Sequence, residues 1–148
     1  MRNELFGPLE IEFLISLALS IVAGYVSGIE RELKGKDAGV NTHIMVVTGS
    51  MLFTFLSMIV DPLSKSRISA QIVTGIGFLG AGLIIKEGLT VKNLTTAASI
   101  WYASAIGMAI GYGYYVVAAA ATIASVIIPL IPHPQARKRN NGAGNGGA

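Results

Sequence analysis

Residues 71–85, QIVTGIGFLGAGLII, constrain this chain more than any other stretch of the sequence. They are apolar enough to form most of a membrane span, which needs ~20 residues. Yet they include four glycines, Gly75, Gly77, Gly80 and Gly82. In water a glycine costs a helix about 1 kcal/mol relative to alanine, whereas in lipid it lets two helix backbones approach closely. The stretch therefore predicts a helix at the centre of a membrane protein, either wedged between other helices or broken near its middle.

The helical repeat of ~100° per residue divides these glycines between two faces. One face carries Gly75 and Gly82 together with the polar residues Gln71 and Thr74. Gly77 and Gly80 fall roughly opposite, so small residues are available for packing on both sides. Polar side chains within lipid need a partner. Gln71 and Thr74 therefore either make structural hydrogen bonds to another helix or line the path of an ion or ligand.

The composition of the whole chain supports a membrane protein of one domain. Its 148 residues are 52% hydrophobic and only 13% charged, against about 25% charged residues in soluble domains, and the mean hydropathy is +0.61. The absence of cysteine excludes disulfides and thiolate metal sites. The segment before the first apolar run carries three glutamates and one arginine, unlike a secretory signal, so that run is expected to be a retained span.

Five apolar runs predict an all-α membrane protein with five transmembrane helices. The runs cover residues 13–29, 43–60, 68–85, 94–111 and 114–131. Residues 111–114, GYGY, predict a tight turn between the last two runs, and Asn93 is expected to cap the fourth helix. We expect residues 1–132 to form the transmembrane domain. Residues 133–148, basic and then rich in glycine and asparagine, are expected to form a disordered tail.

The basic residues are distributed unequally between the two sides that these runs define. One side receives eight of the eleven, namely Arg31, Lys34, Lys36, Lys86, Lys92, Arg137, Lys138 and Arg139. The other side receives Arg2, Lys65 and Arg67. Because cytoplasmic loops carry the excess of lysine and arginine, the N-terminus is expected outside and the C-terminus in the cytoplasm. A multi-pass protein of the cell inner membrane is expected.

Small residues four apart mark further surfaces where helices approach. Gly24 and Gly28 form a GxxxG pair in the first run, and Ala103, Gly107 and Gly111 extend the pattern in the fourth. Such spacing favours close helix packing. It does not distinguish packing within one chain from a homodimer, and we expect the protein to be a homo-oligomer, a dimer.

The end of the first run carries the carboxylates closest to the membrane core. Glu30 and Glu32 lie ~200° apart on a continuous helix, so both cannot face one small ion. They either form an interfacial charge cluster with Arg31 and Lys34, or Glu30 turns inward, as intramembrane carboxylates usually do.

Other polar residues stand where the second and fourth runs begin. His43 is either an interfacial histidine or a ligand or proton relay. Thr95 and Thr96 either cap and pack, or offer hydroxyl groups to a cation. Trp101 lies about two turns in and is expected to pack inside the bundle, with a partner for its N–H. No enzyme motif such as GK[ST], GxSxG or HExxH is present, so no catalytic residues are predicted.

Four blocks of sequence together resemble the MgtC/SapB family of inner-membrane proteins. They are GIERE at 28–32, AGVNTH at 38–43, RISAQIVTGIGFLGAGLI at 67–84 and NLTTAASIWYASAIGMAIGYG at 93–113. The family usually has arginine in place of Asn41 and glycine in place of Asn93. Its larger members carry a soluble cytoplasmic domain after the fifth span, so this chain resembles the short, SapB-like form.

The resemblance implies a role in adaptation to low Mg²⁺, in a family that is associated with virulence. The family signature covers Glu30, Glu32, the four glycines of residues 71–85, Thr95, Thr96 and Trp101. We expect a non-enzymatic protein of Mg²⁺ homeostasis that acts through contacts with other membrane proteins. The alternative is a Mg²⁺ transporter or channel with a path along the glycine-rich third helix. Apart from Mg²⁺ no cofactor is expected, and the lipid bilayer, not nucleic acid, is the expected partner.

Overall fold

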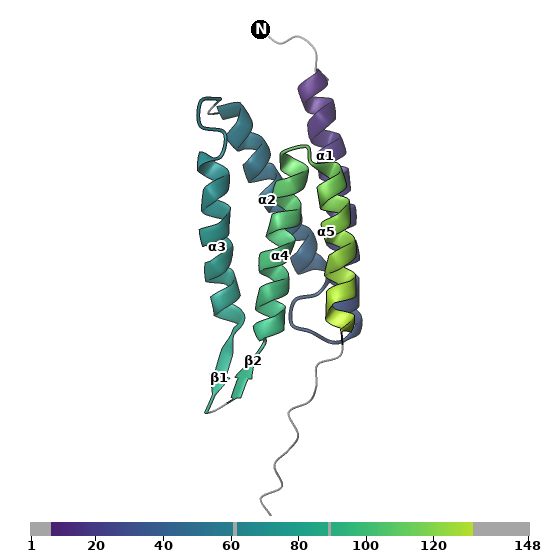
Figure 1. Ribbon diagram of the computed structural model, residues 1–148, viewed down its shortest axis with the longest axis vertical. Coiled ribbons are helices and arrows are strands. Elements are labelled where there is room, and N and C mark those ends of the chain that lie inside the picture. Colours follow the sequence, from purple (N-terminus) through teal and green to yellow (C-terminus); the bar gives the residue numbers. More distant parts are fainter. Residues whose placement is uncertain (1–6, 61, 89, 132–148) are drawn as a thin grey trace, which may run out of the picture.

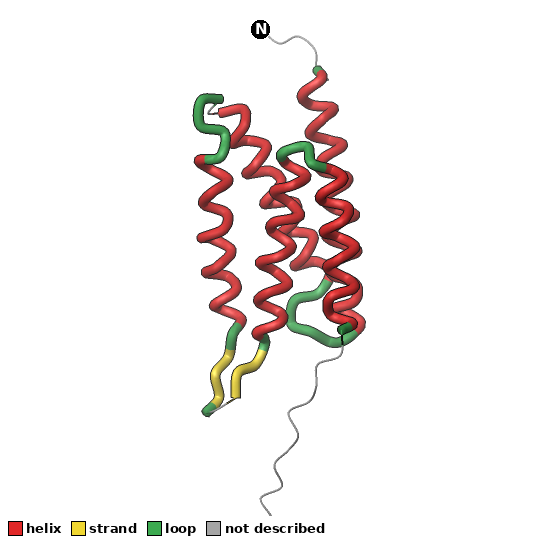
Figure 2. Tube along the Cα trace, in the orientation of Figure 1, coloured by secondary structure: helices red, strands yellow, loops and turns green. Residues whose placement is uncertain are grey.

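The computed structural model describes residues 7–60, 62–88 and 90–131, which form a bundle of five helices with a short β-hairpin (Figures 1 and 2). The elements are α1 (Pro8–Leu33), α2 (Val40–Val60), α3 (Arg67–Leu83), β1 (Ile85–Glu87), β2 (Thr90–Lys92), α4 (Leu94–Gly111), α5 (Tyr115–Ile127) and a 3₁₀ turn, η1 (Ile128–Leu130). Successive helices run in opposite directions along the bundle (Figure 1). The five expected helices are therefore all present within the described residues.

The helices α2 and α4 form the middle of the bundle. The helix α2 packs against α1, α4 and α3, and α4 packs in addition against α1 and α5. The helix α3 lies at one edge, where it contacts only α2 and α4 extensively (Figure 1). It is unbroken from Arg67 to Leu83. The expectation that the glycine-rich helix occupies the centre, or is broken, was therefore wrong.

Close backbone contact explains the glycine pairs of α1 and α4. A Cβ atom at Gly24 would lie 2.6 Å from the Cα of Ile44, and one at Gly28 would lie 2.6 Å from the Cα of Val40. Further along α2, a Cβ at Gly107 of α4 would overlap the carbonyl oxygen of Val47. Both glycine patterns are used to pack helices of the same chain, because side chains there would hold the backbones apart.

Gly111 continues the α4 contact one turn further along. A Cβ added there would lie 2.7 Å from the carbonyl oxygen of Met51 and 2.7 Å from the Cβ of Thr54. Four glycines on two helices thus bring α1 and α4 into close contact with successive turns of α2. This close approach fixes the arrangement of these three helices.

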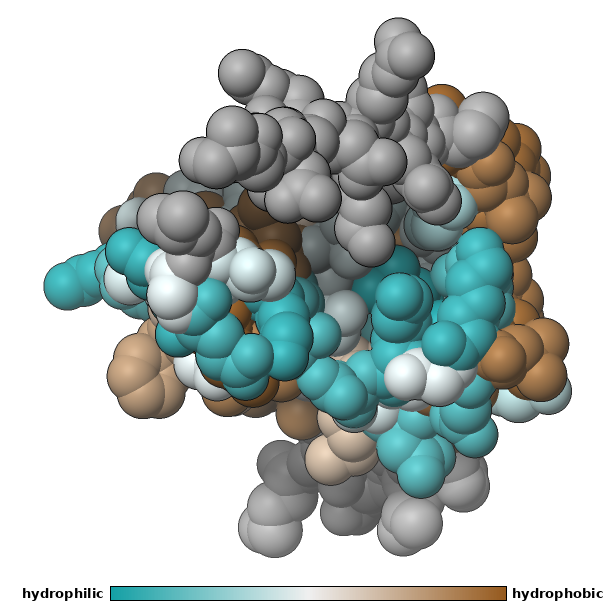
Figure 3. All heavy atoms as spheres, turned by 90° about the horizontal axis from the view of Figure 1, so that it is seen from below, coloured by the Kyte–Doolittle hydropathy of each residue, from teal (hydrophilic) through white to brown (hydrophobic). Residues whose placement is uncertain are grey.

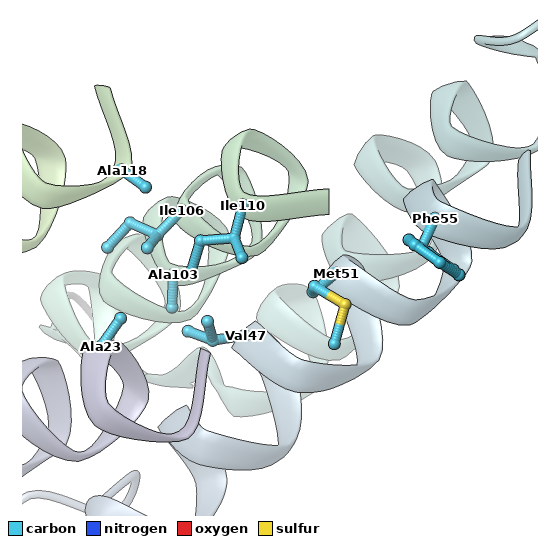
Figure 4. Close-up of a cluster of buried hydrophobic side chains, with 8 residues drawn as sticks. All are labelled: Ala23, Val47, Met51, Phe55, Ala103, Ile106, Ile110 and Ala118. Carbon is cyan, nitrogen blue, oxygen red and sulfur yellow. The ribbon is translucent and has the colours of Figure 1, made fainter. Parts of the chain in front are cut away.

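The main hydrophobic core lies where α1, α2, α4 and α5 meet (Figure 4). It consists of Ala23, Val47, Met51, Phe55, Ala103, Ile106, Ile110 and Ala118. Hydrogen bonds between hydroxyl groups join α1 to α5. Ser125 donates a hydrogen bond of 2.9 Å to Ser27, and Ser16 and Tyr115 are 3.2 Å apart between their hydroxyl oxygens. Such bonds give the hydroxyl groups partners that water would provide in solution and that lipid tails cannot provide.

The boundaries of the elements differ from the apolar runs in ways that have local causes. The helix α1 begins at Pro8, which suits the first turn because proline lacks the N–H that would be unpaired there. The β-hairpin at 85–92 was not predicted, since three-residue strands leave little periodicity to read. The turn before α5 is where it was expected, with Gly113 at φ +77°. The predicted disordered tail lies outside the described residues.

Three described helices are long and apolar enough to cross a membrane, namely α1, α2 and α4. The helices α3 and α5 are shorter, and both are apolar. They lie alongside the longer helices in the bundle (Figure 1). Length and composition therefore establish three helices capable of spanning a membrane, within a bundle of five.

The two ends of the bundle differ in charge. The loop between α1 and α2 and the hairpin lie at one end, whereas the connection from α2 to α3 lies at the other (Figure 1). Viewed from the hairpin end, hydrophilic residues gather on the surface and apolar residues surround them (Figure 3). Of the described basic residues, this end carries Arg31, Lys34, Lys36, Lys86 and Lys92, and the opposite end carries Lys65 and Arg67. We call the former the basic end.

Candidate functional site

A cavity of about 420 Å³ lies at the basic end, lined by α1, α2, α4, α5 and η1. Its charged and titratable lining residues are Glu30, Arg31, Lys34, Lys36 and His43. Ser99 and Tyr102 line it as well, and Ala98, Ala103, Ile128 and Pro129 give it an apolar wall. It combines several charges with an apolar surface inside a helix bundle.

The guanidinium of Arg31 is the most deeply buried charge of the cavity. Arg31 is only 4% exposed, and its Nη2 donates a hydrogen bond of 2.9 Å to Oγ1 of Thr96. Its Nε, which is buried, has no hydrogen-bond partner among the described residues. Because a buried charge is costly unless its donors are paired, this arginine retains unused capacity to bind an anionic or polar group.

His43 contributes a second buried group with one nitrogen in use. The side chain is 1% exposed, and Nδ1 lies 2.9 Å from the carbonyl oxygen of Gly39. A carbonyl only accepts hydrogen bonds, so Nδ1 carries a hydrogen and Nε2 is an acceptor in the neutral ring. Nε2 is buried and has no partner among the residues described. His43 is therefore part of the cavity and not an exposed interfacial residue.

The two glutamates in the last turn of α1, Glu30 and Glu32, have different roles, as their separation on the helix predicted. The carboxylate of Glu30 faces the cavity, with its side chain 12% exposed, and pairs with Lys34. Glu32 is exposed and accepts a hydrogen bond of 2.7 Å from the backbone N–H of Val40. It thus caps the start of α2. Glu30 is the carboxylate that turns inward.

Asn93 stands at the N-cap position of α4 but does not cap the helix with its side chain. Its φ of +64° lies in the left-handed region, which glycine adopts freely and asparagine tolerates better than most residues. The side-chain amide instead donates a hydrogen bond to the carboxylate of Asp37 in the loop between α1 and α2. This backbone conformation suits asparagine as well as the glycine that the family resemblance leads one to expect here.

The remaining predicted site residues on α4 are divided between the cavity and the outside. Thr95 lines the cavity, and Thr96 is buried behind it as the partner of Arg31. Trp101 is 51% exposed, so the expectation that it packs inside the bundle was wrong. The core-facing side of α4 carries small or aliphatic residues instead, namely Ala103, Ile106 and Ile110.

The polar residues of α3 do not join the cavity. Gln71 and Thr74 are exposed on the side of α3 that faces away from α4. We define the α3 outer face by Gln71, Thr74, Gly75, Phe78 and Gly82, which share one side of the helix at ~100° per residue. Part of it borders a mostly apolar groove of about 560 Å³ between α2 and α3.

Three of the four glycines of α3 meet no neighbouring helix. A Cβ at Gly75, Gly77 or Gly82 would find no atom within 4 Å among the described residues. Only Gly80 faces α4, where a Cβ would lie 3.7 Å from the carbonyl oxygen of Ala97, an ordinary contact. The expected packing of Gly75, Gly77 and Gly82 is thus not found among the described residues, because α3 has described neighbours on one side only.

The structure thus brings together Glu30, His43 and Thr95, and it separates them from Glu32, Gln71, Thr74 and Trp101. The central residue of the cavity, Arg31, was not predicted as a site residue. Its position beside Glu30 in the GIERE block was the available signal. Within the described residues, no group of three or more His, Cys, Asp or Glu side chains is arranged to hold a metal ion.

Comparisons with known proteins place this structure in context. The family model described as "MgtC family" matches residues 17–137. "Protein MgtC" of Salmonella typhimurium (strain LT2) is 39% identical over 128 residues, which are 86% of this chain and 55% of that protein. "Putative magnesium transporter YhiD" of Escherichia coli (strain K12) is 46% identical over 113 residues, covering 70% of this chain and 53% of that protein.

A cyanobacterial protein is similar over a comparable region. "Uncharacterized protein slr0014" of Synechocystis is 45% identical over 105 residues, covering 70% of this chain and 45% of that protein. The chain therefore spans about half the length of the curated relatives that it matches. No solved structure matches it.

Proposed function

Because this chain belongs to the MgtC family, we propose that it serves Mg²⁺ homeostasis as a non-enzymatic protein that contacts other membrane proteins. Family membership and the apolar helices support a membrane protein with a role in Mg²⁺ homeostasis. The proposal adds the mode of action, and the α3 outer face supplies the surface.

The exposure of the α3 outer face is the observation that carries this proposal. Gln71 and Thr74 lie on this face beside Phe78, which is 82% exposed. A Cβ at Gly75 or at Gly82 would meet no described atom within 4 Å. Polar side chains are costly in contact with lipid, and small residues let a second helix approach closely. A partner helix seated here gains hydrogen bonds and close packing that lipid tails do not offer.

A five-span arrangement in the inner membrane accompanies the proposal. All five helices cross, with α3 and α5 as the short spans, the N-terminus is outside, and the basic end faces the cytoplasm. The described basic residues support this orientation, because five of them lie at the basic end and two at the opposite end.

This orientation predicts a simple labelling pattern. The natural chain has no cysteine, so one introduced cysteine reports one position. Leu63, which is fully exposed, lies at the opposite end, and Lys86 lies exposed in the hairpin. In spheroplasts, a membrane-impermeant maleimide is expected to label Leu63→Cys at once and Lys86→Cys only after the membrane is permeabilised. The reverse pattern would show that the orientation is inverted.

The mode of action is tested by combining transport and growth measurements. We expect the purified protein alone in liposomes to carry no Mg²⁺ flux above that of empty liposomes. In a strain that lacks this protein, the double substitution Gly75→Leu and Gly82→Leu is expected to abolish growth at low Mg²⁺ that the wild type restores. The matched control is Ala119→Leu with Ala120→Leu on the exposed side of α5, which is expected to restore growth fully.

Both double variants must retain the thermal stability of the wild type, since all four positions are exposed. Growth of the α3 variant at the wild-type rate would contradict the proposed contact surface. Mg²⁺ flux by the wild type alone would contradict the mode of action. It would favour the alternative function, a Mg²⁺ transporter with a path along α3.

Two observations favour that alternative. One relative is named a putative magnesium transporter, and the inward carboxylate of Glu30 offers an oxygen ligand of the kind that Mg²⁺ prefers. The polar residue of α3 that borders the groove against α2 is Gln71. In this alternative, Gln71→Leu and Glu30→Gln each abolish the flux.

A homodimer remains part of the proposal, with a different surface from the one expected. The glycine faces of α1 and α4 are occupied by α2 of the same chain, so they are not free to pair two copies. The α3 outer face is a helix surface that carries open glycines, Gly75 and Gly82. If a second copy is the partner, Phe78→Cys is expected to form a disulfide-linked dimer, whereas Val116→Cys on α5, also highly exposed, is not.

A further inference from the structure

The charges of the cavity at the basic end do not balance. Three cationic side chains, Arg31, Lys34 and Lys36, line it with a single carboxylate, that of Glu30. His43 is the other titratable lining group that faces these charges, apart from Tyr102. With neutral histidine and tyrosine the lining carries a net charge of +2. The cavity therefore attracts an anion, and more strongly because its walls exclude water.

Unused donors lie within this positively charged space. The Nε of Arg31 has no partner among the described residues, although the side chain is only 4% exposed. Lys36 is exposed, and so is Lys34, whose Nζ pairs with the carboxylate of Glu30. Tyr102 is a further lining residue. Guanidinium and ammonium donors are the groups that recognise phosphate oxygens in proteins.

The other half of the cavity is apolar and open to the side of the bundle. Ala98 and Ile128 both line the cavity and are exposed on the outer surface, Ile128 by 53%. Pro129 and Ala103 continue the apolar wall. A volume of about 420 Å³ suits a small ligand. The cavity thus offers cationic donors at the headgroup level and an apolar exit toward the lipid tails.

We propose that this cavity binds the phosphate group of an anionic phospholipid, with the acyl chains leaving between α4 and η1 past Ala98 and Ile128. Arg31 and the two lysines hold the phosphate, and Glu30 limits the affinity by repulsion. Basic pockets between transmembrane helices are known to select anionic headgroups. The proposal concerns a lipid site and does not depend on which protein contacts the α3 outer face.

Titration calorimetry of the purified full chain in detergent tests the site with three probes. These are dihexanoyl-phosphatidylglycerol, dihexanoyl-phosphatidylcholine with the same chains and no net charge, and inorganic phosphate. We expect at least a tenfold preference for the anionic lipid over the neutral one, and binding of inorganic phosphate that is weaker by at least tenfold. Phosphate binding as tight as that of the anionic lipid would assign the site to a free phosphate and overturn the lipid proposal.

Charge variants give expected changes of opposite sign. Lys34→Gln with Lys36→Gln should weaken binding of the anionic lipid by roughly 25-fold, since each lysine near a lipid headgroup contributes about a factor of five. Glu30→Gln should strengthen it. The control, Lys86→Gln with Lys92→Gln in the hairpin of the same end, removes the same charge outside the cavity and should change the affinity less than threefold. An equal loss in the control would overturn the proposal.

A shape variant tests the apolar exit independently of charge. Ala98→Trp places a large ring at the mouth of the cavity and should weaken binding at least tenfold. Ala105→Trp, an exposed position further along α4 that does not line the cavity, should leave the affinity unchanged. Thermal unfolding of the alanine and lysine variants must match that of the wild type, as all of these positions are exposed. Unchanged affinity in Ala98→Trp would rule out the proposed exit.

Discussion

Replacing Gly107 by leucine is expected to destabilise the whole bundle by about 3 kcal/mol or more. Even the first side-chain atom at this position would overlap the carbonyl oxygen of Val47 and lie 2.8 Å from the Cβ of Ser50. These atoms belong to the middle of α2, whose backbone is held by its own helical hydrogen bonds. The helices α2 and α4 must therefore separate, and the core cluster between them opens.

The measurement is the thermal unfolding midpoint in detergent, where a decrease on the order of 10 °C is expected. Gly77→Leu on α3 is the matched control, because it introduces the same side chain where the described residues leave open space. It should leave the midpoint within about 2 °C of the wild type. Equal stability of the two variants would show that α2 and α4 are not packed as closely as described.

Replacing Thr96 by valine is expected to cost about 1.5–3 kcal/mol, although the two side chains have nearly the same shape. The hydroxyl of Thr96 accepts the hydrogen bond from Nη2 of Arg31, and both residues are buried, with 1% and 4% exposed. Valine leaves the buried guanidinium without this acceptor, while its Nε is already unpaired within the described part of the chain. A charge in such surroundings is costly unless its donors are paired.

Thr95→Val is the control for this second prediction, since Thr95 is exposed at the edge of the same cavity. Urea or thermal unfolding of the two variants should differ by at least 1 kcal/mol. If Thr96→Val unfolds like the wild type, the guanidinium of Arg31 has another partner, and the cavity is more hydrated than its burial indicates. If Thr95→Val lowers the free energy of unfolding by the same amount, the hydroxyl groups of Thr95 and Thr96 stabilise this end in general, and the bond to Arg31 has no special part in it.

The sequence by itself determined the class of the protein and the identity of its helices. Uninterrupted apolar runs bounded by charged or turn-forming residues are enough to predict helices in lipid, because only internally hydrogen-bonded segments are stable there. The glycine spacing of α1 and α4 likewise marked surfaces of close approach. The helical repeat alone was also sufficient to separate Glu30 from Glu32, and the structure places their carboxylates on different sides of α1.

Only the tertiary structure decided which of these surfaces meet. Glycine is buried against a neighbouring backbone at position 107 and faces open space at position 77. The difference arises because α4 has neighbours on several sides, whereas α3 lies at the edge of the bundle. Arg31 reads as an ordinary interfacial charge in the sequence, and it is buried because α4 brings Thr96 to it from 65 residues away. The residue type at one position, such as glycine or arginine, limits which contacts a helix can make there. The neighbour that makes the contact is fixed by how all five helices pack together.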